Sequence, residues 1–158
     1  MERAPMTPGG RDRLHEELRK LKNVERPKII KEIAVAREHG DLKENAEYQY
    51  AKEKQSFIEG RILEVEDRLS RSEVIEIFGD PEKVTFGCMV TVVDAETDKK
   101  SVYKIVGKDE ADIKVRKISY ESPIAKALIN KSEGDVVEFR APGGLRELEI
   151  VSLSAIRD

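Results

Sequence analysis

The stretch Gly40-Asp41-Leu42-Lys43-Glu44-Asn45-Ala46-Glu47-Tyr48 separates two long segments whose apolar residues repeat at helical spacing. In the segment before it, the repeating positions are Leu14, Leu18 and Leu21, followed on a shifted line by Ile30, Ile33 and Ala34. In the segment after it, they are Ile58, Ile62, Val65 and Leu69. Because two antiparallel helices can bury such stripes against each other, the pattern predicts an α-hairpin coiled coil with a polar tip.

Local signals place the ends of the first helix. Thr7-Pro8 is typical of a helix start, since a hydroxyl caps the first turn and proline lacks only an N–H that would be unpaired there. Gly40 is typical of a helix stop. Pro27 lies in the interior, where the apolar line shifts, so we expect a kink there and not a break.

After residue 77 the period changes to two, which is typical of strands. Residues 78–83 form a turn-rich linker. Strands are expected at Met89–Val93, Val102–Val106, Ile113–Val115, Val136–Phe139 and Leu148–Val151, with one short helix beginning at Ser122-Pro123. The predicted fold is therefore α+β: a hairpin over residues 1–77, a linker over 78–83 and a small antiparallel sheet domain with one short helix over 84–158.

Composition narrows the class of protein. The chain has 158 residues, a net charge of −3 and 39% charged residues. Proteins that bind the phosphates of nucleic acid usually carry a net positive charge, so free nucleic acid is not the expected partner of this chain. The single Cys88 fits a reducing compartment. No apolar run reaches membrane-spanning length and no signal-peptide pattern is seen, so we expect a cytoplasmic protein that does not bind membranes.

The acids of the tip allow two interpretations. On a helix beginning near Asp41, the spacing of Asp41, Glu44 and Tyr48 would put all three on one face. Asp41 and Glu44 would then form a capping box, with purely structural roles. Alternatively, the two carboxylates bind a divalent cation such as Mg²⁺, which prefers oxygen ligands. Two exposed acids hold Mg²⁺ weakly, so in that case another macromolecule must complete the site.

Several motifs, in order along the whole chain, resemble the Gre family of bacterial transcript-cleavage factors. The tip stretch extends back to Ala36-Arg37-Glu38-His39, and the other motifs are Pro5-Met6-Thr7, Glu59-Gly60-Arg61-Ile62, Ile105-Val106-Gly107, Asp109-Glu110-Ala111-Asp112, Ser122-Pro123-Ile124-Ala125 and Pro142-Gly143-Gly144. The resemblance implies a factor that enters the secondary channel of RNA polymerase and stimulates hydrolysis of backtracked RNA near its 3′ end. It also implies an immunophilin-like fold for the sheet domain, which would dock at the channel rim.

The resemblance also implies roles for individual residues. Asp41 and Glu44 would be catalytic and help hold a Mg²⁺ shared with the polymerase. Arg37, Lys43, Tyr48 and Lys52 would contact RNA or the channel, although each has a structural alternative: a solvated charge for the cations and a seam contact for Tyr48. Ser122, Pro123 and Ile124 would dock on the polymerase, unless Ile124 packs inward. The free protein is expected to be monomeric and not an enzyme alone.

Two other functions are alternatives to transcript cleavage. A regulator of the same shape that binds the channel without promoting cleavage would not need the acid pair at the tip. A free-standing prolyl isomerase would need an aromatic-lined pocket, whereas residues 77–158 contain only Phe78, Phe86, Tyr103, Tyr120 and Phe139. We therefore expect no isomerase activity, because fold alone does not carry function.

Overall fold

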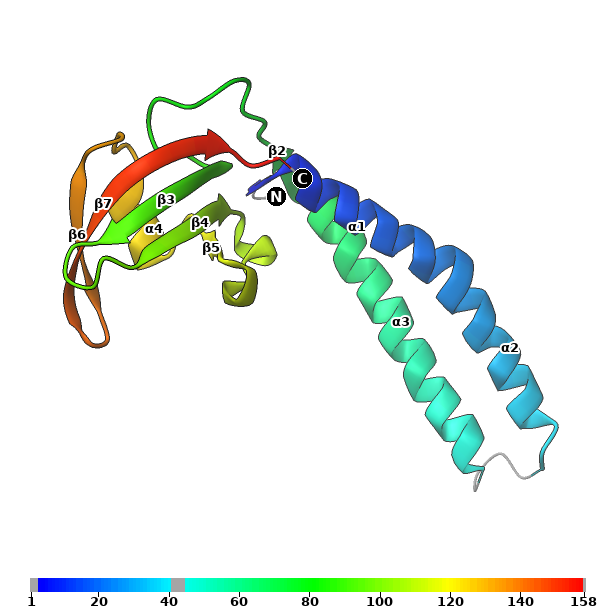
Figure 1. Cartoon of the computed structure of the whole chain (residues 1–158). Coiled ribbons are helices and arrows are strands. Elements are labelled where there is room, and N and C mark those ends of the chain that lie inside the picture. The colour runs from blue at the N-terminus through cyan, green and yellow to red at the C-terminus, as the bar shows by residue number, and fades with distance from the viewer. Residues whose placement is uncertain (1–2, 41–44, 158) are drawn as a thin grey trace. The chain divides into compact units, whose positions relative to one another are not determined.

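The structure is a computed structural model that describes residues 3–40 and 45–157, and its internal contacts divide it into two units. The first unit contains Arg11–Ser72 and is helical. The second joins Arg3–Gly10 to the chain from Glu73 onward and contains the main sheet. Figure 1 shows the helices and the strands of the two units, which confirms the predicted α+β class.

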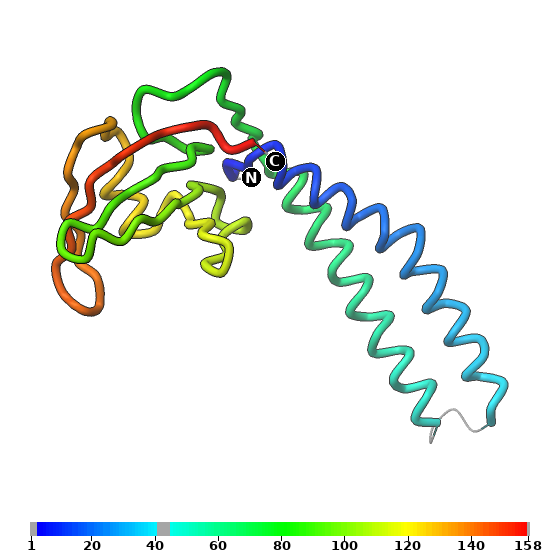
Figure 2. Tube along the Cα trace, in the orientation of Figure 1, coloured from blue at the N-terminus to red at the C-terminus, as the bar shows by residue number. Residues whose placement is uncertain are grey.

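The helical unit is the predicted hairpin. Its first arm runs through α1 (Pro8–Lys20), the π-helical turn η1 (Leu21–Glu25) and α2 (Arg26–Arg37), and its second arm is α3 (Ala46–Arg71). Figure 2 shows the first arm as one continuous coil lying alongside α3. As predicted, the helix begins at Pro8 and continues past Pro27.

The register shift in the first arm is produced by η1. The backbone N–H of Arg26 donates to the carbonyl of Leu21, five residues earlier. Proline in a helix interior clashes with the carbonyl four residues before it, and a wider turn just upstream of Pro27 relieves that constraint. The turn also corrects one expectation. Ile29 and Ala36 are buried, at 1% and 3% exposure, because η1 rotates the buried face by about one residue. Ile30, at 52% exposure, and Ala34 are exposed, although both were expected on the inward line.

Aliphatic side chains from both arms form the seam of the hairpin. The buried cluster contains Ile29, Ile33, Ala51, Ile58 and Ile62, with Leu18, Leu21 and Tyr48 packed against it. The buried positions on α3 confirm the stripe predicted for that helix. Burial of these side chains, at about 25 cal/mol per Å² of apolar surface, stabilises a hairpin whose isolated helices would be marginal in water.

The second unit contains a five-stranded sheet with strand order β5-β4-β3-β7-β6. Its strands are β3 (Cys88–Asp94), β4 (Lys100–Val106), β5 (Lys117–Ser119), β6 (Val136–Ala141) and β7 (Gly144–Ala155). The helix α4 (Pro123–Leu128) packs on the sheet, and Ala125 and Leu128 are fully buried there. Two short strands, β1 (Ala4–Met6) and β2 (Ser72–Val74), form a separate pair.

Two details of the sheet differ from the expectation. Residues Ile113–Val115 form a 3₁₀ turn and not a strand, since Asp112 caps it through the Lys114 N–H and Arg116 takes a left-handed conformation with φ +60°. This capped turn takes the run out of the sheet, and Ile113 is 71% exposed. The strand that does form, β5, pairs with β4 in parallel, so the sheet is mixed.

Cys88 is a fully buried strand residue, and burial raises the pKa of its thiol.

Glu110 fixes the N-terminal segment within the second unit. Its Oε2 accepts hydrogen bonds from the backbone N–H groups of Thr7 (3.1 Å) and Gly107 (2.9 Å), and its Oε1 accepts from the Thr7 hydroxyl. Thr7 Oγ1 in turn accepts from the N–H of Gly10 at 3.1 Å, which confirms Thr7 as the cap of α1. A Cβ at Gly10 would displace the Glu110 carboxylate from its bonds to Thr7, so glycine suits this close approach.

Candidate functional site at the hairpin tip

The first arm ends where the sequence predicted. The last residue of α2 is Arg37, and Gly40 follows outside the helix with φ +123°, a conformation that glycine adopts without strain. The predicted residues Asp41, Lys43 and Glu44 lie outside the described residues. Their roles as metal ligands and as an RNA contact stay predictions.

Asn45 begins the second arm and joins it to the first. Its Oδ1 accepts a hydrogen bond from the backbone N–H of Tyr48 at 3.0 Å, so Asn45 is the N-cap of α3. Its Nδ2 donates to the carbonyl of Ala36, near the end of α2, at 2.7 Å. The Asn45 side chain thus pairs one backbone N–H at the start of α3 and one backbone carbonyl near the end of α2, which the helices themselves leave unpaired.

This geometry corrects the capping interpretation of the acids. That interpretation placed the start of the helix near Asp41, with Asp41 as the cap. The described helix starts at Ala46, and the capping position is occupied by Asn45, whose backbone is extended (φ −78°, ψ 102°). Tyr48 therefore lies in the first turn of α3, while Asp41 and Glu44 lie outside the described residues.

Two further contacts cross between the arms beside Asn45. The guanidinium of Arg37 lies 6.0 Å from the centroid of the Tyr48 ring, within the range of a cation–π interaction. His39 Nδ1 lies 3.2 Å from Glu47 Oε2. We call Asn45 and these two pairs the tip clasp. The clasp holds Ala36 to Asn45 and so fixes both ends of the segment that carries the acids.

The structure thus brings together two of the predicted contact residues, Arg37 and Tyr48. Tyr48 is half-buried and packs on the hairpin seam, which supports its structural alternative. Lys52 is exposed, and its Nζ donates to Gln55 Oε1 at 3.2 Å. Within residues 3–40 and 45–157, no three His, Cys, Asp or Glu side chains gather closely enough to hold a metal ion.

The three residues of the predicted docking segment, Ser122 to Ile124, lie in different environments. Ser122 Oγ accepts from the Ala125 N–H at 3.3 Å and caps α4, while Pro123 occupies its first turn and is exposed. Ile124 is half-buried and packs against the core of the sheet unit, as its inward-packing alternative anticipated. Among these three residues, Pro123 is the one most available to a partner.

The aromatic residues of the second unit are dispersed. Phe86 packs edge-on against Tyr120, with ring centroids 5.8 Å apart, and Phe78 is 87% exposed. Tyr103 lies beneath the Arg116 guanidinium at 5.5 Å. The absence of isomerase activity stays a prediction. In the described part of the chain, no helix is both long enough and apolar enough to cross a membrane.

Sequence reasoning missed Asn45, the central residue of the clasp. The signal was present, because asparagine is among the preferred N-cap residues and the segment Ala46-Glu47-Tyr48 follows it directly. Asp41 is also a preferred N-cap residue and directly follows the glycine stop. The helix start was therefore predicted at Asp41, too early in the chain.

Comparisons with known proteins cover both units. Residues 4–74 match the family model described as "Transcription elongation factor, N-terminal", and residues 79–155 match "Transcription elongation factor, GreA/GreB, C-term". A transcription elongation factor GreA from Maricaulis maris is 54% identical over 98% of this chain and 99% of its own length. One from Anaeromyxobacter sp. is 56% identical over 100% of this chain and 96% of its own length. The crystal structure of GreA factor homolog 1 of Thermus thermophilus is 27% identical and covers 98% of this chain and 100% of that protein, with a TM-score of 0.45.

Proposed function

This chain belongs to the GreA/GreB family of transcription elongation factors, and from that premise we propose that it stimulates RNA polymerase to cleave backtracked RNA. In this proposal the hairpin enters the secondary channel of the polymerase. Asp41 and Glu44 at the tip help to hold a catalytic Mg²⁺ together with the polymerase's own carboxylates. The protein is then a cofactor of the polymerase and not an enzyme alone.

The observation that carries the proposal is the capping of α3 by Asn45. With Asn45 bonded to the Tyr48 N–H, this helix start does not need Asp41 as its cap. The carboxylates of Asp41 and Glu44 are the oxygen ligands that Mg²⁺ prefers, and two such ligands plus water and phosphate are a common set for this ion. The clasp joins residues on either side of these acids, because His39 pairs with Glu47 and Asn45 bonds to Ala36.

When bound, Mg²⁺ would lower the pKa of a coordinated water and stabilise the leaving oxygen of the phosphodiester. Asp41 is the proposed first ligand, and Glu44 the second ligand or the group that orients the water. Lys43 and Lys52 are proposed to contact RNA phosphate. Arg37 would share its charge between RNA and the Tyr48 ring, over which it lies. Pro123 is proposed to contact the channel rim.

The test uses a stalled, backtracked polymerase complex with labelled RNA and Mg²⁺. Saturating wild-type protein should release short 3′ fragments. Asp41→Asn should bind equally well but lower the maximal cleavage rate by at least the roughly 10- to 100-fold that follows loss of even an outer-shell partner of a metal site. The matched control is Asp67→Asn, which removes an acid paired with Arg71 at the other end of α3.

The control should cleave like the wild type. Equal cleavage by wild type and Asp41→Asn would contradict the proposed metal role. If the wild-type protein binds and changes elongation without releasing any fragment, the alternative of a non-cleaving channel regulator replaces the proposal.

A further inference from the structure

An open groove lies between the two arms near the tip of the hairpin. Its volume is about 440 Å³. It is lined from α2 by Lys28, Lys31, Glu32, Val35 and Ala36, and from α3 by Glu47, Tyr50 and Ala51. We call it the tip groove. All of its lining residues belong to the helical unit.

The groove exists because the buried side chains between the two arms become smaller toward the tip. Farther from the tip, the arms pack through isoleucines such as Ile29, Ile58 and Ile62. At the groove the buried positions are Ala36 and Ala51, at 3% and 4% exposure. Alanine is too short to fill the space that isoleucine occupies between two helices. The space therefore stays open to the surface.

Large apolar side chains stand at the walls of the groove and remain in contact with water. Val35 on α2 is 46% exposed, and Tyr50 on α3 is 68% exposed. Phe57, seven residues after Tyr50 and hence on the same helical face, is 74% exposed. A concave surface with an exposed tyrosine has the composition of the centre of a protein interface.

The charged residues of the groove differ from those of the rest of the hairpin. Lys22, Arg26 and Arg61 each pair with an acid of the opposite arm or of their own helix. By contrast, neither Lys28 nor Lys31 makes an ion pair with another described residue. Glu47 is engaged by His39. The three charged residues that line the groove from α2 are Lys28, Lys31 and Glu32, and their charges sum to +1.

We propose that the tip groove is a docking site for an apolar side chain of RNA polymerase that is flanked by carboxylates. The apolar side chain would fill the space above Ala36 and Ala51 against Tyr50 and Val35, while the carboxylates pair with Lys28 and Lys31. The inference rests on the proposed function, because the groove shares Ala36 and Glu47 with the tip clasp. Any channel that receives the tip therefore receives the groove.

The test separates affinity from chemistry, using cleavage rate as a function of factor concentration. Tyr50→Ser should raise the half-saturating concentration by about 5- to 30-fold, the loss typical of a central interface residue. The maximal cleavage rate should stay unchanged. Tyr50→Phe should restore wild-type affinity, because it keeps the ring that fills the groove.

The matched control is Leu63→Ser. Leu63 is 70% exposed on the same helix, but it lies roughly 140° around the helix from Tyr50 and outside the groove. Its half-saturating concentration should equal that of the wild type. Circular dichroism should show the same helix content for all variants, because both positions are exposed.

A second pair of variants tests the charges. Lys28→Gln with Lys31→Gln should weaken binding to polymerase and reduce its dependence on salt, since screened ion pairs are removed. The binding of Tyr50→Ser should also be measured on core polymerase without nucleic acid. A defect that appears only when RNA is present would assign the groove to RNA and overturn the proposal.

Wild-type affinity for Tyr50→Ser would also overturn the proposal, as would a lower maximal rate at unchanged affinity. These outcomes are distinguishable from failure of the proposed function. If Asp41→Asn cleaves normally, the metal role fails, whereas the affinity of Tyr50→Ser still reports on docking.

Discussion

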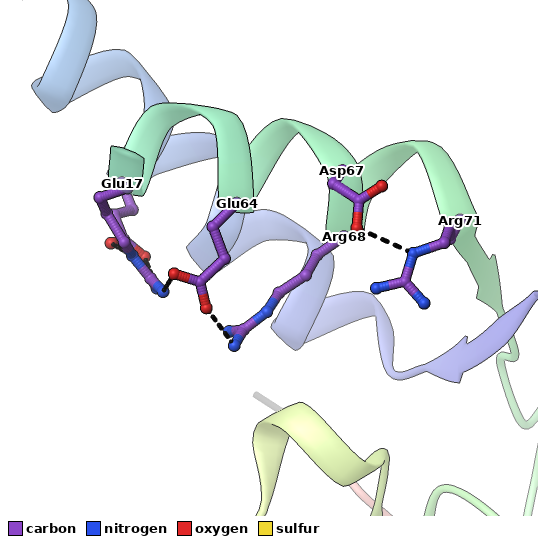
Figure 3. Close-up of polar contacts among 6 residues, drawn as sticks. Glu17, Glu64, Asp67, Arg68 and Arg71 are labelled. Atoms are coloured by element: carbon purple, nitrogen blue, oxygen red, sulfur yellow. Dashed lines mark hydrogen bonds and ion pairs between the residues drawn. The ribbon is translucent and has the colours of Figure 1, made fainter. Parts of the chain in front are cut away.

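The two ends of the hairpin are built from different interactions. At the base, α3 is tied to the first arm by isoleucine packing and by paired charges. Glu17 accepts two hydrogen bonds from Arg61, at 2.5 and 2.7 Å, and Glu59 accepts two from Arg26, both at 2.8 Å. Figure 3 shows how Glu64 and Asp67 then pair with Arg68 and Arg71 along α3.

At the tip, the seam residues are alanines, and the arms are joined by the three contacts of the clasp. Neither lysine of the tip groove, Lys28 or Lys31, forms an ion pair with a described residue of the hairpin. The contacts that stabilise the hairpin are thus concentrated at its base, and the groups proposed to bind are at its tip. The base keeps the arms together, which leaves the tip free to carry polar groups and an open groove. The following variants test this separation.

The largest effect is expected at the base, for Ile62→Ala. Ile62 is 2% exposed in the buried cluster, and its truncation removes apolar contacts and leaves a cavity. We expect the free energy of unfolding to fall by about 3 kcal/mol. Urea denaturation followed by helix ellipticity measures this change. Loss of less than about 1 kcal/mol would mean that the seam does not hold the hairpin together.

A smaller effect is expected at the tip, for Asn45→Ala. The substitution removes the cap of α3 and the bond to the Ala36 carbonyl. The free energy of unfolding should fall by about 1 kcal/mol, the usual cost of losing a cap. The maximal cleavage rate should fall further than this stability loss explains, because the clasp positions the acid-bearing segment. Asn45→Asp keeps a capping oxygen and should restore stability but not the bond to Ala36.

The smallest effect is expected for the ion pairs of the base. The hydrogen bond from Arg61 lowers the pKa of Glu17 below its ordinary value of 4.5. A carboxyl with a lowered native pKa stabilises the fold above its unfolded pKa, and this contribution is lost as the pH falls through the native value. Since Glu17 is 36% exposed, solvent screens the pair.

Arg61→Gln should therefore cost about 1 kcal/mol or less at pH 7. The difference from the wild type should shrink below about pH 4 and in high salt. Unfolding measured at pH 7 and pH 3, each at low and high ionic strength, checks the sign. A difference that stays unchanged as the pH falls would show that Arg61 acts through packing and not through its pairing with Glu17.

The sequence patterns predicted most of the fold because the hydrophobic periods were long. The stripe from Ile58 to Val65 spans two helical turns, and the four longer strands each alternate over several residues. The failures were short or depended on context. Ile113–Val115 offered only three residues, and the cap at Asp112 and the left-handed Arg116 turned them into a 3₁₀ turn. Ile30 was assigned to the seam because helical counting cannot anticipate a π-helical turn.

The candidate site was predicted in location but not in detail. The glycine stop at Gly40 correctly marked the end of the first arm, whereas the functional role of the acids beside it stays a prediction. The clasp depends on contacts between residues of different arms, such as Asn45 with Ala36 and Arg37 with Tyr48. Such contacts require the relative position of two helices, which periodicity along one helix does not specify. The tip groove was missed for the same reason.

The π-helical turn has a consequence for the length of the stalk. If its extra residue is discounted, the inward positions of the first arm, Leu14, Leu18, Leu21, Ile29, Ile33 and Ala36, follow an unbroken heptad repeat. The turn thus works as a spacer that lengthens one arm by a single residue, about 1.5 Å of helix rise, while keeping its inward face in phase. A change in the number of residues there must therefore be matched in α3, because the hydrogen bond from Asn45 to Ala36 fixes how the ends of the two arms meet.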